Sequence, residues 1–349
     1  MYAAVVHGKE DIRYEQVETP VPGRGQVLVK VKYTGICGSN IPRVNDGACH
    51  FFPTILGHEF SGTVASLGEV VDTVEIGDHV AGIPLVPCMK CKDCTDGNYS
   101  LCKHYSFVGS RQDGSFAEYV LVPQRNVFKY DKKVSFKQGA FFEPSTVALH
   151  GLKVAGYEHG KNVAVVGCGT VGLFALQWIR IKGADRIIAI DISEERLALA
   201  RELGADITLN SGDEDFQDRV LEITEGRGFD YVFDVTGNSY SMQQTFSLVG
   251  NKGMVCMIGT PKKPVEFSVK QWEYLNRKEM LLTGSWMSYS APFPGEEWEM
   301  TAHYFNTGDL KVMDKMIDRI LPLEKIADAF ELFKIPGAVN GKIMIDSER

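Results

Sequence analysis

The chain has 349 residues, which is too many for one hydrophobic core, so we expect two domains. Apolar residues make up 44% and charged residues 23%, which are ordinary values for a soluble globular protein. The net charge is -8 and acids and bases are interspersed, so the clustered Lys and Arg that phosphate backbones require are missing. We therefore expect no nucleic acid partner.

The start of the chain and its most apolar window predict neither a signal peptide nor a membrane span. Residues 1–8 lack a charged segment followed by a long apolar stretch. The window 163–181 contains three glycines and suits a strand, turn and helix better than a bilayer crossing. We expect a cytoplasmic protein without a membrane partner.

Residues 1–147 alternate short β patterns with glycine turns and contain few long helical patterns. Strands at this spacing are typical of an antiparallel, barrel-like domain. The clearest examples are 26–31, 60–65, 78–82 and 116–122.

Four cysteines follow one another closely in the series Cys88-x2-Cys91-x2-Cys94-x7-Cys102, among Lys, Asp, Gly and Asn. Such a segment is an exposed loop, and in a reducing compartment close thiols favour metal binding over disulfides. Four thiolates form the closed tetrahedral set of a structural zinc. An iron–sulfur cluster is the alternative, but a ferredoxin series places its fourth cysteine after three residues and before a proline. Here Lys103 follows Cys102, so zinc is favoured.

The pattern changes near residue 146 to strands alternating with helices. The run 163–166 is continuously apolar, as expected for a strand buried on both faces, and a helical pattern follows over 171–181. Six such strands indicate a doubly wound parallel sheet. The later segments are strands at 187–190, 207–209, 231–233, 255–258 and 280–282, and helices opened by Ser193 (ending at Gly204), Asp213 and Ser239.

Three glycines, Gly167-x-Gly169-x-x-Gly172, lie between the first of these strands and its helix, which is the context of a dinucleotide-binding turn. The first glycine makes the turn, the second lets the backbone approach a pyrophosphate, and the third lets the helix pack on the strand. The pyrophosphate would lie at the helix N-terminus. A glycine turn without a cofactor is the alternative.

An acid at the end of the next strand favours NAD over NADP. Asp191 lies nineteen residues after Gly172, where its carboxylate would accept hydrogen bonds from the ribose hydroxyls and repel a 2′-phosphate. The predicted cofactor residues are Gly167, Gly169, Thr170, Val171, Gly172, Asp191 and Arg196.

A second set of metal ligands would have to assemble from distant positions. A thiolate, an imidazole and a carboxylate with one open position form the ligand set of a catalytic zinc. A single histidine is more often an ordinary core or surface residue. The candidates are Cys37, His58, Glu59 and Glu143.

The order of four features resembles that of the zinc-containing medium-chain dehydrogenases, and the resemblance covers the whole chain. These features are the Cys37-Gly-Ser segment, Gly57-His58-Glu59, the four-cysteine loop and the later glycine turn. The resemblance implies an α/β protein: a GroES-like, mostly antiparallel β catalytic domain over 1–147 and 287–349, and a Rossmann domain with a six-stranded parallel sheet over 148–286. It implies NAD, two zinc ions per subunit, and a homodimer or homotetramer.

The resemblance also implies roles for single residues. Cys37, His58 and Glu143 would bind the catalytic zinc, and Glu59 would lie beside it and exchange with water as a ligand. The four-cysteine loop would bind the structural zinc. A glutamate at 143 resembles the polyol and threonine dehydrogenase branch. Ser39 would hydrogen-bond the substrate oxygen and pass its proton outward.

Three further stretches, 41–43, 109–114 and 284–298, are similar to the part of this branch that acts on galactitol 1-phosphate. The implied reaction is the zinc-assisted oxidation of a secondary hydroxyl of a sugar alcohol phosphate to the ketose phosphate, with hydride transfer to NAD. The aromatic stretch 284–298 either contacts the substrate directly or serves as a dimer contact or core packing, since aromatic residues are also enriched at interfaces.

The fork geometry of arginine suits phosphate oxygens, so we expect Arg43 and Arg111 to contact the substrate phosphate. The alternative is that they are solvated or pair with Asp46 and Asp113. One departure concerns Asn40, which stands where close relatives commonly have an acid, and an amide can keep a hydrogen bond but not the charge.

Two other functions stay open from the sequence. Within the same class, the substrate could be an unphosphorylated polyol such as sorbitol, or L-threonine. From a different class, the chain could be a catalytically silent NAD-binding zinc protein.

Overall fold

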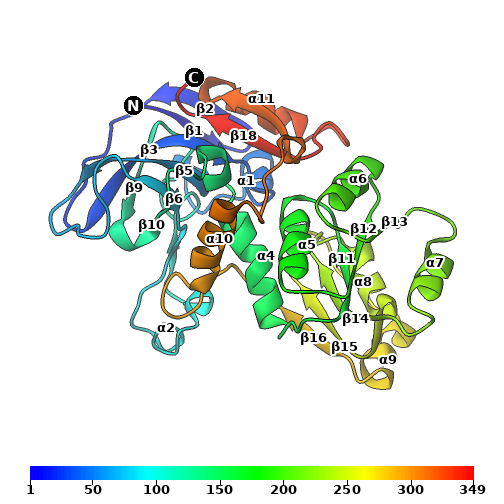
Figure 1. Ribbon diagram of the computed structural model, residues 1–349. Coiled ribbons are helices and arrows are strands. Elements are labelled where there is room, and N and C mark those ends of the chain that lie inside the picture. The colour runs from blue at the N-terminus through cyan, green and yellow to red at the C-terminus, as the bar shows by residue number, and fades with distance from the viewer. The chain divides into compact units, whose positions relative to one another are not determined.

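The computed structural model describes all of residues 1–349, and the chain divides into two compact units (Figure 1). Unit 1 comprises Met1–Glu143, Tyr289–Gly308 and Val312–Arg349, and unit 2 comprises Pro144–Ser288 and Asp309–Lys311. The domain boundaries expected from the sequence, 147/148 and 286/287, stay a prediction. Unit 1 is completed by residues that follow unit 2 in the chain.

Unit 2 contains a six-stranded, all-parallel sheet in the order β13-β12-β11-β14-β15-β16 (green to yellow in Figure 1). The chain runs outward from β11 in both directions, and ligands of doubly wound folds bind at the carboxyl ends of the strands beside this point. The sheet predicted from the sequence is confirmed. Its strands are β11 (Asn162–Val166), β12 (Arg186–Asp191), β13 (Ile207–Asn210), β14 (Phe229–Asp234), β15 (Val249–Met257) and β16 (Leu281–Gly284).

The helices of unit 2 begin where the sequence supplies caps. The Ser193 hydroxyl accepts a hydrogen bond from the Arg196 N–H at the start of α6, and Ser268 forms a capping box with Gln271 at the start of α9. Such side chains satisfy N–H groups that have no partner within the helix. The helices are α4 (Phe142–Val154, entering from unit 1), α5 (Thr170–Ile181), α6 (Glu194–Glu202), α7 (Phe216–Ile223), α8 (Ser239–Leu248) and α9 (Val269–Arg277).

Unit 1 is built mainly from antiparallel strands. One sheet has the order β2-β1-β4, a second has the order β10-β6-β5-β3-β18-β17 with β9 also paired to β3, and β7 pairs with β8. The strands are β1 (Tyr2–Gly8), β2 (Asp11–Gln16), β3 (Gln26–Gly35), β4 (Thr54–Ile55), β5 (Glu59–Leu67), β6 (His79–Gly82), β7 (Leu85–Val86), β8 (Ser106–Phe107), β9 (Tyr119–Pro123), β10 (Val127–Lys129), β17 (Ile317–Pro322) and β18 (Lys342–Asp346).

Strand β3 is the centre of the larger sheet. It pairs with β5 along one edge and with β9 and then β18 along the other, so β18 adds a C-terminal strand next to the end of β3. Strand β17 pairs with β18 in the parallel direction. The end of β3 is therefore surrounded by segments from both ends of the chain.

Apart from α10, which has 12 residues, the remaining helices of unit 1 are short. No helix of the protein combines the length and the apolar character that crossing a bilayer requires. These elements are α1 (Asn40–Asn45), α2 (Lys92–Thr95), α3 (Phe136–Gly139), α10 (Glu296–Thr307), α11 (Ile326–Leu332) and the 3-10 turns η1 (Tyr99–Leu101), η2 (Gln124–Asn126), η3 (Asp314–Met316) and η4 (Leu323–Lys325).

Candidate active site and metal centres

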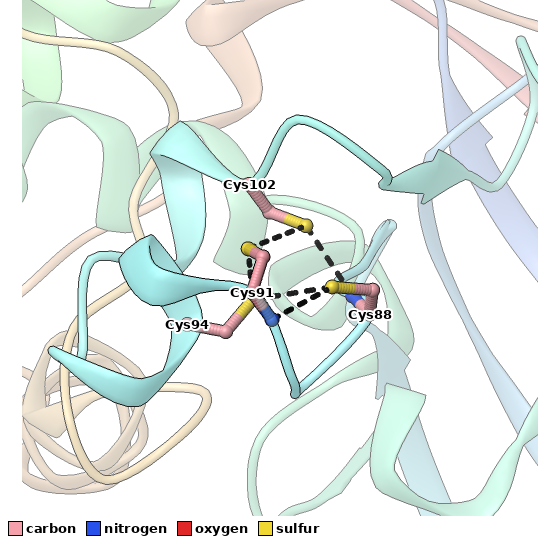
Figure 2. Close-up of side chains that lie close together, drawn as sticks. All are labelled: Cys88, Cys91, Cys94 and Cys102. Atoms are coloured by element: carbon pink, nitrogen blue, oxygen red, sulfur yellow. Dashed lines mark hydrogen bonds between the residues drawn. The ribbon is translucent and has the colours of Figure 1, made fainter.

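The four cysteines of the loop between β7 and β8 point their sulfur atoms toward one another (Figure 2). The Sγ–Sγ distances are 3.5 Å for Cys91–Cys94, 3.8 Å for Cys91–Cys102 and 3.9 Å for Cys88–Cys94. Four sulfurs at about 2.3 Å from one zinc ion lie roughly 3.8 Å from one another at the corners of a tetrahedron. The cluster therefore has the size of a single-ion site, whereas an iron–sulfur cluster would hold its sulfurs farther apart.

Backbone groups of this loop favour the thiolate form of Cys88, whereas burial raises the pKa of Cys94 to about 12. N–H groups of Lys90 and then Cys91 lower the pKa of Cys88 to about 6, and the Cys91 N–H lies 3.4 Å from the Cys88 sulfur. The cysteines are free thiols, and their sulfurs lie too far apart for a disulfide of about 2.05 Å. The donor set fits a structural zinc.

A second cluster lies where β3 ends and β5 begins. The ligand atoms of Cys37, His58 and Glu59 all lie within 4.8 Å of one another. Cys37 follows the end of β3, and Glu59 is the first residue of β5, paired in register with Gly35. Strand pairing thus brings together residues that are about twenty positions apart in the sequence.

The histidine of this cluster is prepared to bind a metal. The His58 side chain is buried, and its Nδ1 atom has no hydrogen-bond partner. Burial lowers the pKa of His58, although the charges of Glu143 and Glu59 oppose this shift. Neutral imidazole is the form that coordinates metals. A thiol, a neutral imidazole and a carboxylate at this spacing fit a zinc ion.

Glu143 does not belong to this group of three but lies within electrostatic reach of it. Burial, reinforced by the Glu59 and Cys37 charges, raises the pKa of Glu143 to about 8, while His58 acts in the opposite direction. The carboxyl group is in the first turn of α4. Its place among the catalytic zinc ligands stays a prediction.

A lysine that the sequence analysis did not consider completes the cluster. Lys342 in β18 donates hydrogen bonds to both oxygens of Glu59, at 2.8 and 2.5 Å. Burial alone would lower the pKa of Lys342, but the charges of Glu59, Cys37 and Glu143 outweigh it and raise this pKa. A lone lysine within the apolar run 342–345 is the signal that could have drawn attention to it.

Ser39 and Asn40 both contact Cys37. The Asn40 Oδ1 accepts the Cys37 N–H at 3.0 Å, and its buried Nδ2 has no partner. Burial raises the pKa of the Cys37 thiol, and a hydrogen bond from Ser39 acts against this shift. Ser39 is exposed, as a group that exchanges protons with solvent must be. Its catalytic role stays a prediction.

The charges of the two arginines expected to bind phosphate both act on one histidine. Burial lowers the pKa of His50, and the charges of Arg111 and then Arg43 add to this effect. The Arg43 charge also reaches His58. Arg43 donates to the Ser39 carbonyl at 2.5 Å, and Arg111 lies 4.5 Å from the ring centre of Tyr105.

Neither arginine is used in an ion pair. Asp46 and Asp113 do not pair with them, and the Asp113 carboxylate instead accepts the Ile55 N–H at 2.9 Å. The buried Nε of Arg43 has no hydrogen-bond partner. Both guanidinium groups therefore keep donors for an anionic ligand.

The glycine turn after β11 has an open face. Gly167 has a φ of +97°, and a side chain at Gly172 would overlap the Gly167 carbonyl oxygen. A Cβ at Gly169, the N-cap of α5, would meet no atom within 4 Å. Thr170 and Val171 form the first turn of that helix. Free space beside a helix N-terminus fits a pyrophosphate.

Asp191 lies at the end of β12, beside this turn. Its carboxylate accepts the N–H groups of Cys168 at 2.7 Å, Ile192 at 2.8 Å and Ser193 at 3.0 Å. Arg196 lies in the first turn of α6, where its N–H caps onto Ser193. The carboxylate thus has a structural role in addition to the predicted contact with ribose.

The aromatic stretch 284–298 contributes to packing. Tyr289 and Trp298 are buried and their rings stack at 6.3 Å with an interplanar angle of 18°. Trp286 keeps half of its surface exposed. The two buried rings are part of a core, and no contact of theirs identifies a substrate.

Comparisons with known proteins agree with both halves of the chain. Residues 23–132 match the alcohol dehydrogenase GroES-like domain, and residues 170–303 match the zinc-binding dehydrogenase family. Galactitol 1-phosphate 5-dehydrogenase of Escherichia coli K12 is 39% identical over 331 residues, covering 95% of each chain. Sorbitol dehydrogenase of Bacillus subtilis is 33% identical over 75% of this chain and 76% of its own. L-threonine 3-dehydrogenase of Bacillus velezensis is 33% identical over 91% of each.

Solved structures give the same result. The crystal structure of galactitol-1-phosphate dehydrogenase from Escherichia coli superposes with a TM-score of 0.93 at 34% identity, covering 99% of this chain and 100% of that one. A zinc-binding dehydrogenase from Sinorhizobium meliloti, bound to NADP, has a TM-score of 0.89 at 28% identity and covers 99% and 98%. The predicted zinc and nicotinamide cofactors are confirmed at the level of the family. With an open glycine turn in one unit and two metal-ligand clusters in the other, this chain belongs to the zinc-type alcohol dehydrogenases.

Proposed function

We propose that this enzyme oxidises a secondary hydroxyl of a sugar alcohol phosphate of the galactitol 1-phosphate type to the ketose phosphate. The observation that carries this proposal concerns two arginines, Arg43 and Arg111, that form no ion pair. The charges of both lower the pKa of His50. The Arg43 charge is also felt at His58 in the metal-ligand cluster. A phosphate held by these guanidinium groups would place the neighbouring hydroxyls near the cluster.

Zinc and NAD supply the chemistry when bound, the ion by polarising the alcohol oxygen and NAD by accepting the hydride. Cys37, His58 and Glu143 would hold the ion, with Glu59 beside it. Ser39 would relay the hydroxyl proton: its Oγ takes the substrate proton as its own hydroxyl proton passes to solvent, which its exposed position allows.

The residues at the end of β12 favour NAD over NADP. The Asp191 carboxylate is fixed by three backbone N–H groups, so it cannot turn away from the ribose. A 2′-phosphate would then face a negative charge. The NADP seen in the Sinorhizobium meliloti structure belongs to that protein, and the cofactor preference of this chain follows from its own carboxylate.

Steady-state kinetics with phosphorylated and free hexitols test the substrate. We expect a higher kcat/KM for galactitol 1-phosphate than for galactitol, and a loss of this preference by at least about tenfold in Arg43→Ala and Arg111→Ala, because a charged hydrogen bond contributes about 1.5–3 kcal/mol. Arg125→Ala, an exposed arginine in η2, is the matched control and should keep the preference. Undiminished discrimination in both Arg43→Ala and Arg111→Ala would remove the phosphate assignment.

Two alternatives are decided by the same substrate panel. The similarity to sorbitol and L-threonine dehydrogenases keeps an unphosphorylated polyol or threonine as the second candidate, and a higher kcat/KM for either would favour it. A catalytically silent NAD-binding zinc protein would form no NADH with any substrate. Activity that a chelator abolishes and zinc restores would exclude silence.

We also infer that the enzyme works in the cytoplasm as a homodimer or homotetramer. The similarity of the whole chain to zinc-type dehydrogenases supports this assembly, and its free cysteines fit a reducing compartment. Light scattering of the purified protein would measure the assembly, and a monomer at micromolar concentration would contradict it.

A further inference from the structure

The ion pair between Lys342 and Glu59 is enclosed within unit 1. The two side chains are 8% and 2% exposed, and the Lys342 Nζ also donates to the Ile36 carbonyl at 3.3 Å. Both carboxylate oxygens of Glu59 are occupied by the same ammonium group. By contrast, the Lys32–Asp346 pair, which links β3 to the same strand β18, has its lysine 25% exposed.

Strand register and one glycine create the room for this pair. Gly35 in β3 pairs with Glu59 of β5 on one side and with Met344 of β18 on the other. A Cβ at Gly35 would overlap the Glu59 Oε2 and would lie 3.1 Å from the Lys342 Cδ. The two charged side chains therefore meet over the one position of β3 that has no side chain.

A gain in stability does not explain why a buried ion pair is present at the end of β3. Moving an ion pair out of water costs free energy that its own attraction often fails to recover, and apolar residues of similar size are frequently as stable. A buried pair one residue away from His58 therefore indicates a role for the cluster. The Glu59 oxygen involved lies within 4.8 Å of the Cys37 and His58 ligand atoms.

With Glu143 as the proposed third ligand beside Cys37 and His58, the charges around the ion are balanced only when the lysine is counted. A Cys37 thiolate with ionised Glu59 and Glu143 carries three negative charges, and a divalent ion supplies only two positive ones. The Lys342 ammonium supplies the third. Without it, the carboxylate of Glu59 would have no partner except the ion.

We propose that Lys342 is a positioning residue that holds Glu59 beside the catalytic metal and keeps its carboxylate from closing the coordination position meant for substrate. The inference rests on the proposed assignment of Cys37 and His58 as metal ligands. Lys342 competes with the metal ion for the position of this carboxylate, because it holds both oxygens at hydrogen-bonding distance on its own side. Glu59 is then a potential ligand that does not coordinate the ion while Lys342 holds it.

Metal release from the intact enzyme tests this role without any substrate. In Lys342→Met, Glu59 loses its cation and turns to the ion. A chelator should then remove the catalytic metal at least about tenfold more slowly, because an added carboxylate ligand must leave first and a tenfold change needs only about 1.4 kcal/mol. In the cobalt-substituted enzyme the visible absorption should change as the coordination number rises. Release as fast as in the wild type, with an unchanged unfolding temperature, would overturn the proposal.

Three variants separate positioning from a structural effect. Lys342→Arg keeps the charge and should restore wild-type release. Lys32→Met breaks the matched pair between β3 and β18 and should leave release and absorption unchanged. The double variant Lys342→Met/Glu59→Gln should recover the wild-type cobalt spectrum, because the amide is a poor ligand. A spectrum that stays altered in the double variant would contradict the proposal.

A further measurement decides the question even if Lys342→Met does not fold. Glu59→Gln keeps an acceptor for Lys342, and since Glu59 is held off the ion, its cobalt spectrum should match the wild type. A different spectrum would show that Glu59 is already a ligand and would overturn the proposal. A Cys37→Ser variant that still binds two metal ions would instead refute the metal-site assignment underlying the proposed function.

Discussion

Asp191 serves the fold and, in our proposal, the cofactor as well. Its carboxylate fixes the glycine turn to the end of β12 through the Cys168 N–H and accepts two further N–H groups of the following residues. A carboxylate has about four lone-pair positions, so one stays available for a ribose hydroxyl. The position of Asp191 in the sequence indicated only its role toward the cofactor. Its role in the fold depends on how two loops meet.

Replacing Asp191 should therefore affect both cofactor choice and stability. In Asp191→Ala we expect the ratio of kcat/KM for NAD to that for NADP to fall at least about tenfold, since the repulsion between carboxylate and phosphate is of order 1–4 kcal/mol. Parallel kinetics with the two cofactors measure this ratio.

Asp206→Ala is a suitable control for this prediction. Its carboxylate accepts the Ile187 N–H at 2.7 Å near the opposite end of β12 and pairs with Arg180. Both substitutions should lower the free energy of unfolding by about 1–3 kcal/mol, but only the change at 191 should alter the ratio. A ratio that stays the same in Asp191→Ala would contradict the cofactor role.

Two glycines in the turn from β11 into α5 are important for different physical reasons. Gly172 is required because the Gly167 carbonyl lies against it, whereas Gly169 faces open space. Gly172 is therefore important for folding, whereas Gly169 determines what can approach the helix N-terminus.

Alanine at these two positions should separate folding from cofactor binding. Gly172→Ala should destabilise the protein by more than about 2 kcal/mol, because the turn must open to relieve the overlap. Gly169→Ala should change the unfolding temperature little and weaken NAD binding at least about tenfold, because a methyl group would occupy the pyrophosphate's place. Thermal unfolding and NAD titration measure the two effects, and equal NAD affinity in Gly169→Ala and wild type would refute this location.

Local patterns were sufficient for the elements of unit 2 but not for the centre of unit 1. Strand β11 is apolar because both of its faces are buried, and α6 begins at Ser193 because that side chain caps it, so both were predictable from neighbouring residues. The four-cysteine site was predictable for the same reason, since its ligands follow one another. The Lys342–Glu59 contact spans 283 positions and depends on the register of β18 against β3. No local pattern specifies that register.

The metal-free protein should lose stability as the pH rises toward 8. Burial raises the pKa of Glu143 to about 8 from an ordinary value of 4.5, so between these values the folded protein holds a proton that the unfolded chain has released. Folding then takes up a proton, and the free energy of unfolding falls with increasing pH. The lowered pKa of His58 acts with the opposite sign, but only at and below its ordinary value of 6.5.

Thermal unfolding of chelator-treated protein between about pH 7 and pH 8 measures this effect. The unfolding temperature of the wild type should fall over this range more steeply than that of Glu143→Gln, which has no titrating carboxyl there but shares all the thiols. Zinc should reduce the difference in slope, because the ion replaces the proton. Parallel slopes in the two metal-free proteins would contradict the buried position of Glu143.

Residues from both ends of the polypeptide form the larger sheet of unit 1, because β18 joins β3 only after the chain has passed through unit 2. On the ribosome, Glu59 is made 283 residues before the lysine that neutralises it. At about 5–20 residues per second this leaves a delay on the order of ten seconds or more. During translation the nascent N-terminal segment therefore carries an uncompensated acid at the start of β5. In our proposal, only the complete chain can bind the catalytic ion with all of these charges in place.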